Sequence, residues 1–208
     1  MVSIEVFISQ SKAPWNRNIH YHGVVLDAVP AGCRRALDAG CGRGWLARDL
    51  APRCGEVVAI DADRDTLARA RAATAADRRI TFVDGDVMTY PFEPGSFDLV
   101  AAIAMLHHVP LDAGLARLRH LLRPGGVLAI VGLHALRPLD YTQALAAIPV
   151  TLAYRLAYGF TEVGAPIKDP VETIGEIRAA CAAALPGAVF RRHLLFRYSI
   201  VWRKPVRE

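Results

Sequence analysis

Short apolar segments alternate with helix-like stretches from about residue 35 onward, and this alternation constrains the fold more than any other feature of the chain. The apolar segments are RRALDA, EVVAIDA, ITFVDGD, FDLVAAIAML and GVLAIVGL. Strands that alternate with helices form βαβ units, in which the strands lie parallel and the helices cover the faces of the sheet. We therefore expect an α/β protein with a doubly wound, mainly parallel sheet.

Side-chain spacing predicts two of the helices. The first carries leucines on one face, spaced by four, three and four residues, at Leu111, Leu115, Leu118 and Leu122. The second is predicted to begin with Asp169 as its N-cap, Pro170 in its first turn and Glu172 as its capping-box acid. After it, residues 189–202 show the period-two pattern of a strand, which fits either one long strand or a hairpin.

The length of 208 residues fits a single domain that can bury a continuous core. We expect residues 35–132 to form this core, with an N-terminal cap at 1–34, a variable insert at 134–168, and a C-terminal helix and strands at 169–208. In open α/β sheets, ligands bind beyond the carboxyl ends of the strands. The cap and the insert are therefore the predicted lid segments over that crevice.

The net charge of +5 comes from the C-terminal segment. Residues 191–208 hold six arginines and lysines against one glutamate, whereas the first 190 residues carry 19 basic and 19 acidic side chains. We interpret the basic segment as a solvated strand edge, and contact with RNA or with an anionic substrate is the alternative. Nucleic acid is therefore not the expected partner.

Cysteine spacing and hydropathy indicate the cellular compartment in which the chain is expected. Four cysteines show neither a C-x-x-C pair nor zinc-type spacing, at Cys33, Cys41, Cys54 and Cys181. The N-terminal residues lack the basic-then-apolar pattern of a signal peptide. The longest apolar stretch, residues 144–160, is interrupted by Pro149 and Arg155, which disfavours a membrane span. We expect a cytoplasmic protein without a metal site.

The segment ALDAGCGRGW is the most informative stretch for ligand binding. A predicted strand ends at Asp38, and glycines follow at Gly40, Gly42 and Gly44, where the backbone can turn sharply and approach a ligand closely. A dinucleotide fingerprint needs its third glycine or alanine one position later, where this chain has Trp45. A nicotinamide or flavin nucleotide is therefore disfavoured.

The pattern D-x-G-x-G-x-G in this loop resembles the first motif of the class I S-adenosylmethionine-dependent methyltransferases. The resemblance continues, in order and with matching spacing, over about residues 35–132. It implies S-adenosyl-L-methionine as the cofactor and a Rossmann-like, seven-stranded sheet with an antiparallel C-terminal strand.

The resemblance also implies roles for acids that follow the second and third strands. In this family, the position of Asp61 accepts both ribose hydroxyls, which suits a carboxylate with two oxygens. The positions of Asp86 and Val87 recognise adenine through the carboxylate and the backbone N–H. A shifted register would use Asp63 and Asp84 instead. The implied cofactor-binding set in the core is Asp38, Gly40, Cys41, Gly42, Gly44, Asp61, Ala62, Asp86, Val87 and Ile103.

His107 and His108 follow the predicted fourth strand, at the edge where the methyl group is expected. Imidazole titrates near neutral pH, so either side chain is a candidate general base for a hydroxyl or amine acceptor. The alternative is that one histidine only bonds to the backbone around the cofactor.

The segment WNRNIHYH precedes the first strand. In similar methyltransferases an N-terminal helix closes over the cofactor, so we assign cofactor closure to His20 or Tyr21 and packing to Trp15. An amphipathic helix with surface histidines is the alternative.

The insert carries apolar side chains at near-helical spacing, at Tyr141, Leu145, Ile148, Leu152 and Leu156, with Tyr154, Tyr158 and Phe160 nearby. Such a surface can line an apolar acceptor pocket, form a dimer interface or belong to the core. His134 follows the fifth strand and is expected at the pocket mouth.

The leading hypothesis is a methyltransferase that acts on oxygen, nitrogen or sulfur of a small molecule, as a monomer or a homodimer. A nucleic-acid methyltransferase is a second hypothesis, motivated by the C-terminal arginines, but the N-P-P-Y-like tetrad common in such enzymes is absent because the matching stretch is AAIAM. A third keeps the fold and the cofactor without methyl transfer. The acceptor itself cannot be inferred from the fold.

Overall fold

The computed structural model describes residues 16–74, 77–135, 148–149, 152–153, 156, 168–193 and 196–206. The predictions for Trp15 and for most of the insert, including Tyr141, Leu145, Tyr154, Tyr158 and Phe160, lie outside these residues. Of the residues predicted to form the apolar stripe of the insert, Ile148, Leu152 and Leu156 are described, and all three are exposed.

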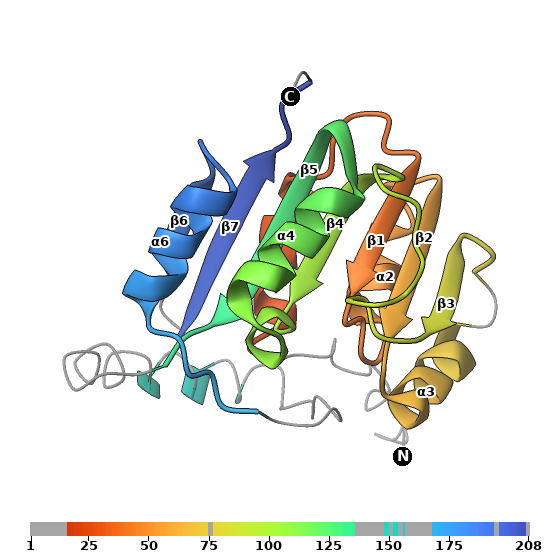
Figure 1. The fold of residues 1–208 in the computed structure, drawn as a ribbon. Coiled ribbons are helices and arrows are strands. Elements are labelled where there is room, and N and C mark those ends of the chain that lie inside the picture. The colour runs from red at the N-terminus through yellow and green to blue at the C-terminus, as the bar shows by residue number, and fades with distance from the viewer. Residues whose placement is uncertain are drawn as a thin grey trace, which may run out of the picture.

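Strands and helices alternate over most of the described chain, as the sequence predicts, but within these residues β3 leads to β4 and β6 leads to β7 without a helix between them (Figure 1). The strands are β1 Arg35–Ala39, β2 Glu56–Asp61, β3 Ile80–Asp84, β4 Phe97–Ile103, β5 Leu122–Leu133, β6 Val189–His193 and β7 Arg197–Arg203. The α-helices are α1 His22–Asp27, α2 Trp45–Leu50, α3 Arg64–Thr74, α4 Leu111–Leu121 and α6 Ile174–Ala184. Short 3-10 helices span η2 Ile19–Tyr21 and η3 Leu106–His108.

The strands form one seven-stranded sheet in the order β3-β2-β1-β4-β5-β7-β6. β1 to β5 pair in parallel, and β7 runs antiparallel to both of its neighbours, β5 and β6. This topology confirms the predicted Rossmann-like, mainly parallel sheet with an antiparallel C-terminal strand. The order reverses between β1 and β4, and such a switch point is where ligands bind in open α/β sheets.

Both faces of the sheet are covered by helices, so the sheet is doubly wound. α4 and α6 lie in front of the sheet in Figure 1 and pack with their apolar sides on one face, where Leu115, Leu118 and Ile177 are buried. On the other face, Val25 of α1 and Leu50 of α2 join a second buried cluster. The central strands are therefore apolar on both sides, which explains their nearly continuous hydrophobic runs.

The helix predictions hold, with corrections at two ends. Leu122 is buried but begins β5 rather than ending α4. The N-cap of α6 is Thr173, not Asp169, and the capping-box acid is Glu176, not Glu172. The Thr173 backbone N–H donates to Oε2 of Glu176 at 2.7 Å, and the Glu176 backbone N–H donates to Oγ1 of Thr173 at 3.4 Å. Thr173 can satisfy this reciprocal pair because its partner acid lies three residues later.

The C-terminal period-two segment is a hairpin rather than one long strand. Phe196, with a φ of 57°, lies in the connection just before β7. The register places Arg197, the first residue of β7, beside Leu133, the last residue of β5. The start of β7 therefore lies at the same edge of the sheet as the carboxyl end of β5. Among the described residues, no helix has the length and apolar character needed to cross a membrane.

Candidate active site

A cavity of about 940 Å³ lies at the carboxyl edge of the sheet. Its walls come from the residues that follow β1, β2, β3 and β4, from the end of β5, from the start of β7 and from the N-terminal segment before α1. The sequence-predicted residues that line it are Asp38, Gly40, Cys41, Gly42, Asp61, Ala62, Asp86, Val87, Ile103, His107 and His108. The fold thus gathers into one cavity side chains that are up to 70 positions apart in the sequence.

Two glycines shape the floor of the cavity, because each holds a left-handed backbone conformation. The φ angles of Gly40 and Gly42 are 72° and 51°. A Cβ atom at Gly40 would lie 2.7 Å from Cγ of Met105, whereas one at Gly42 would meet no atom within 4 Å. Gly40 therefore allows the loop to pack on the segment after β4, and Gly42 leaves open space at the cavity wall.

Gly44 does not line the cavity, in contrast to the other two glycines of the motif. It precedes α2 with a φ of 68°, and a Cβ atom there would lie 2.9 Å from Cε1 of Phe82 on β3. The third glycine therefore permits close packing of the α2 start against the sheet. Its assignment to the cofactor gains no support from its position.

Asp38 lies on β1 and is only 2% exposed. Its Oδ2 atom is buried without a hydrogen-bond partner among the described residues. Burial, and secondly the charge of Asp61, raise the pKa of this carboxyl group to about 7, although a hydrogen bond from the Ala47 backbone opposes the shift. A buried carboxylate is costly unless a cation or donors compensate it, so Asp38 favours a cationic or hydrogen-bond-donating ligand in the cavity.

Asp61 ends β2, and two backbone N–H groups orient its carboxylate. Gly42 donates to Oδ2 at 2.7 Å, and Asp63 donates to Oδ1 at 2.9 Å. Each carboxylate oxygen can accept a second bond, so the group remains able to bind a diol from the cavity. The glycine loop and the ribose-binding candidate are thus linked directly.

Asp63 and Asp84, the alternative candidates for ribose and adenine binding, both bond to other residues of the chain. Oδ1 of Asp63 accepts a hydrogen bond from the backbone N–H of Thr66 at 2.9 Å and so caps the start of α3, although Asp63 also borders the cavity. Oδ2 of Asp84 pairs with Nε of Arg64 at 2.8 Å, and Asp84 does not line the cavity. Asp61 and Asp86 therefore remain the favoured pair.

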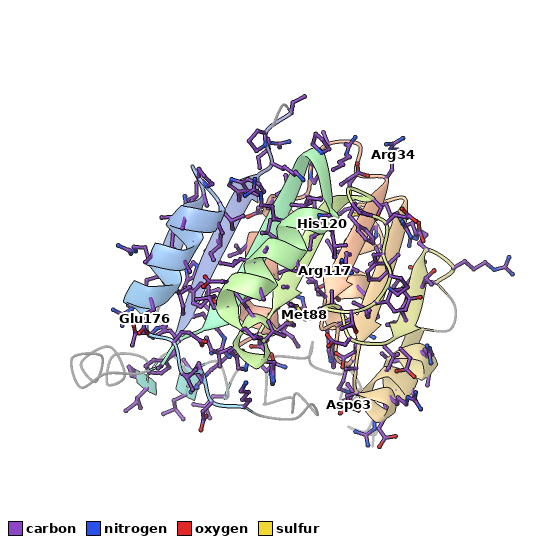
Figure 2. The ribbon with its side chains drawn as sticks, viewed as in Figure 1. Arg34, Asp63, Met88, Arg117, His120 and Glu176 are labelled. Carbon is purple, nitrogen blue, oxygen red and sulfur yellow. The ribbon has the colours of Figure 1, made fainter. Side chains whose placement is uncertain are left out.

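Asp86 and Val87 lie in the loop that follows β3. Oδ1 of Asp86 accepts a hydrogen bond from the Met88 backbone N–H at 2.9 Å. The Val87 carbonyl accepts one from Nε of Arg117 at 3.0 Å, which ties this loop to α4. In Figure 2 the labelled Arg117 and Met88 lie at this junction. The adenine-binding candidates are therefore held by a neighbouring helix.

His107 and His108 occupy η3, and their rings lie 4.2 Å apart. His107 is 8% exposed, and its Nδ1 atom is buried without a hydrogen-bond partner among the described residues. Burial, followed by the charges of His108, Arg197 and Lys168, lowers the pKa of His107 to about 4. His107 is therefore a neutral imidazole at neutral pH. His108 is exposed, and its carbonyl accepts a hydrogen bond from Nζ of Lys168 at 3.4 Å.

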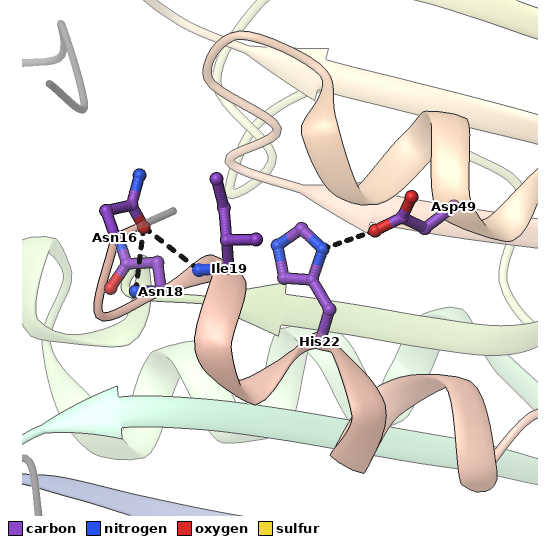
Figure 3. Close-up of polar contacts among 5 residues, drawn as sticks. All are labelled: Asn16, Asn18, Ile19, His22 and Asp49. Atoms are coloured by element: carbon purple, nitrogen blue, oxygen red, sulfur yellow. Dashed lines mark hydrogen bonds and ion pairs between the residues drawn. The ribbon is translucent and has the colours of Figure 1, made fainter. Parts of the chain in front are cut away.

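The N-terminal segment reaches the cavity through residues other than the predicted ones. His20 and Tyr21 do not line it, and the buried ring of Tyr21 packs 4.8 Å from the ring of His193. Oδ1 of Asn16 instead accepts the backbone N–H groups of Asn18 and Ile19, each at 2.9 Å, and so shapes the turn shown in Figure 3. The cavity-lining residues of this segment are Asn16, Arg17, Asn18, Ile19 and His22.

His22 connects the same segment to α2. Its Nδ1 atom lies 2.7 Å from Oδ2 of Asp49 (Figure 3). This contact places the N-terminal segment over the glycine loop side of the cavity. The N-terminal cap therefore contributes to the site, but through polar residues on the turn rather than through Tyr21.

Sequence reasoning missed Arg197, which it assigned to a solvated basic edge. Arg197 is 7% exposed and lines the cavity, whereas Arg191 and Arg192 on β6 are exposed. No signal in the sequence indicates this placement, because it follows from the pairing of β7 with β5. His134, expected at the pocket mouth, does not line the cavity and contacts the Ala135 carbonyl through Nδ1 at 3.0 Å. The described residues contain no cluster of three or more potential metal ligands.

Comparisons with known proteins agree with this geometry. The profile of a family described as methyltransferase domain matches residues 36–126. The chain is 39% identical over 196 residues to an uncharacterized methyltransferase of Mycobacterium bovis, covering 93% of this chain and 98% of that protein. It is 38% identical over 115 residues to a malonyl-[acyl-carrier protein] O-methyltransferase of Enterobacter lignolyticus, covering 55% of this chain and 45% of the relative.

A solved structure supports the fold. The N-methyltransferase NodS from Bradyrhizobium japonicum superposes with a TM-score of 0.61 at 17% sequence identity, covering 89% of this chain and 95% of NodS.

Proposed function

This chain belongs to the S-adenosylmethionine-dependent methyltransferases, and from that premise we propose that it methylates oxygen, nitrogen or sulfur of a compact small-molecule acceptor. The observation that carries the proposal is the cavity of about 940 Å³. Small-molecule sites occupy roughly 300–1,000 Å³, so this cavity is at the upper end of the range and has room for a cofactor and a compact acceptor together.

The residues on the β1–β3 side fit the cofactor. When bound, S-adenosylmethionine supplies a methyl group that its sulfonium has already activated. Asp38 presents an uncompensated buried carboxylate toward a ligand that carries positive charge, and Gly42 leaves space for it. We assign the ribose hydroxyls to Asp61 and the adenine to Asp86 and Val87, because these residues line the same cavity in the expected order.

His107 is the proposed proton acceptor for an acceptor that arrives protonated. Its ring is buried at the cavity, neutral at neutral pH, and has an unpartnered Nδ1 among the described residues. His108 is more exposed, and we assign it to the support of η3. The sheet edge and the N-terminal segment both line the cavity, so they can orient a bound acceptor, which favours direct displacement.

The proposed function is tested by calorimetric titration with S-adenosylmethionine and S-adenosylhomocysteine, with NAD as the control. We expect micromolar binding of the first two alone. A panel of compact hydroxyl, amine, thiol and carboxylate compounds is then screened for release of S-adenosylhomocysteine, beside a structured RNA and a duplex DNA. Release only with the nucleic acids, or conversion of a compound without S-adenosylhomocysteine, would contradict the proposal.

The two histidines are separated by alanine substitution. Loss of a general base typically lowers turnover by about 10² to 10⁴-fold, so His107→Ala is expected to reduce kcat with little change in cofactor affinity. His108→Ala is the matched control and is expected to retain most of the turnover. Equal turnover in both variants and the wild type would remove the proton-transfer role.

A further inference from the structure

The cavity extends beyond the strands that carry the proposed cofactor contacts. Asp38 lies on β1 and Asp61 ends β2, whereas Arg197 begins β7, three strands away from β1 in the sheet (Figure 1). Neighbouring strands are about 4.8 Å apart, so Arg197 lies roughly 14 Å across the sheet from β1. Given the proposed function, Arg197 is therefore on the acceptor side of the cavity.

Arg197 is held in a fixed orientation at the cavity wall. Its Nε and Nη2 atoms donate to Oδ1 of Asn18 at 3.3 and 2.9 Å, and Nη1 donates to the Phe196 carbonyl at 3.3 Å. Burial, followed by the charge of Arg17, lowers the pKa of its guanidinium to about 10, although Tyr21 opposes the shift, so the group stays charged at neutral pH. A preoriented, partly desolvated guanidinium is a strong partner for an oxyanion.

The surrounding lining strengthens the positive potential at this end. Arg17 lines the cavity and its charge acts on Arg197, whereas Lys168 and Asp169 line the cavity beside η3, where Lys168 donates to the His108 carbonyl. Among the described lining residues, the side formed by β1, β2 and the loops after β1 to β3 holds four acids and one basic residue, namely Asp38, Asp61, Asp63, Asp86 and Arg43. The two ends of the cavity therefore differ in charge, and the acceptor end attracts anions.

We propose that the acceptor carries a carboxylate or phosphate group and that Arg197 binds this group. The proposal rests on the proposed function, because it names the acceptor class of the same site. Both groups offer oxygens that match the planar fork of a guanidinium. Arg197 then determines which acceptors bind. His107 lies close enough to Arg197 for the charge of the guanidinium to lower the pKa of the imidazole.

An anion at Arg197 has a consequence for the proton acceptor. The charges of Arg197 and Lys168 contribute to the lowered pKa of His107. A bound anion offsets these charges and raises the pKa of His107, which makes the imidazole a stronger base when the acceptor is present.

The test uses the full chain saturated with S-adenosylhomocysteine and three calorimetric probes that each carry a six-carbon alkyl tail, namely heptanoate, hexyl phosphate and neutral hexanol. At fixed ionic strength, at least one anion is expected to bind about tenfold or more tightly than hexanol. Tighter heptanoate identifies a carboxylate acceptor, and tighter hexyl phosphate identifies a phosphate. Arg197→Met is expected to remove this preference, and Arg197→Lys to retain part of it.

Arg203→Met is the matched control, because Arg203 is exposed at the opposite end of β7. It is expected to keep the full preference for anions. If Arg197→Met does not fold, Arg197→Lys carries the test alone, because loss of part of the anion preference is still expected from it.

The proposal is overturned if the wild-type chain binds the anions no more tightly than hexanol. It is also overturned if the Arg197 variants keep the full preference for anions, whether S-adenosylhomocysteine binding by Arg197→Met is unchanged or is weakened. Weakened S-adenosylhomocysteine binding together with a retained anion preference would assign the guanidinium to the cofactor. A wild-type chain that fails to bind S-adenosylhomocysteine before any probe is added would instead overturn the proposed function.

Discussion

Asp38 and Asp98 are both 2% exposed and lie on adjacent parallel strands, yet their surroundings are opposite. Asp98, near the start of β4, accepts the backbone N–H groups of Arg34 and Arg35 on Oδ2, each at 2.8 Å, and pairs with Arg123 through Oδ1. Asp38, near the carboxyl end of β1, leaves Oδ2 without a partner among the described residues. Figure 2 shows Arg34 and Asp63 at the two opposite ends of the sheet.

This difference separates a structural acid from a ligand-binding acid. Asp98 joins the start of β1 to β4 and to Arg123, so its charge is compensated within the chain. Asp38 is left costly in the absence of a ligand, as the raised pKa shows. At the amino edge Asp98 is thus compensated within the chain, whereas at the carboxyl edge Asp38 and His107 hold buried atoms that a ligand can satisfy.

Asp98→Ala is expected to have the largest effect on stability. The two backbone N–H groups lose their acceptor, which typically costs about 1–3 kcal/mol each, whereas the ion pair adds little because the Arg123 side chain is 41% exposed. Chemical denaturation measures this loss. Asp98→Asn, which can still accept the backbone N–H groups, is expected to be milder, and a cost below about 1 kcal/mol for alanine would refute the structural role.

Asp38→Asn is expected to stabilise the ligand-free chain at alkaline pH. The folded-state pKa is raised from 3.8 to about 7, so the stability present below pH 4 is lost as the pH rises toward 7. The variant lacks this loss and gains up to about 4 kcal/mol at pH 8 relative to the wild type. Denaturation at pH 4 and pH 8 measures the difference, and calorimetry is expected to show weaker S-adenosylmethionine binding. Equal pH dependence in both proteins would contradict the assignment.

Asp61→Ala is expected to weaken S-adenosylmethionine binding by about 1–3 kcal/mol through lost charged hydrogen bonds. Asp63→Ala is the neighbouring control, because Asp63 caps α3 and its loss is expected to lower stability by about 1 kcal/mol with little change in affinity. Calorimetry and denaturation of both variants separate the two roles. An unchanged dissociation constant for Asp61→Ala would remove the ribose assignment.

Most of the fold could be predicted because local patterns and global topology agree. The apolar runs mark β1 to β5, and the leucine spacing marks α4. The N-cap of α6 was misplaced by four residues, since both Asp169 with Glu172 and Thr173 with Glu176 match the capping pattern. Only the hydrogen bonds of the folded chain select between them.

The residues of the candidate site could be predicted where they belong to a sequence motif. They could not be predicted where tertiary packing determines whether a side chain lines the cavity. Asp38, Gly40, Gly42 and Asp61 line the cavity, as the motif implies, but Gly44 instead packs against Phe82. Tyr21, expected to close over the cofactor, is buried and does not line the cavity, whereas Arg197, expected on a solvated strand edge, lines it.

The sequence by itself determined the strand and helix order, the glycine loop and the acids that follow the first three strands, because these features depend on neighbouring residues and fixed spacing. Only the tertiary structure decided which buried acid is satisfied and which arginine faces the cavity. The pairing of β7 beside β5 places Arg197 next to Leu133, a contact between residues 64 positions apart that no local pattern encodes. Charge at the acceptor end therefore depends on long-range strand register rather than on a sequence motif.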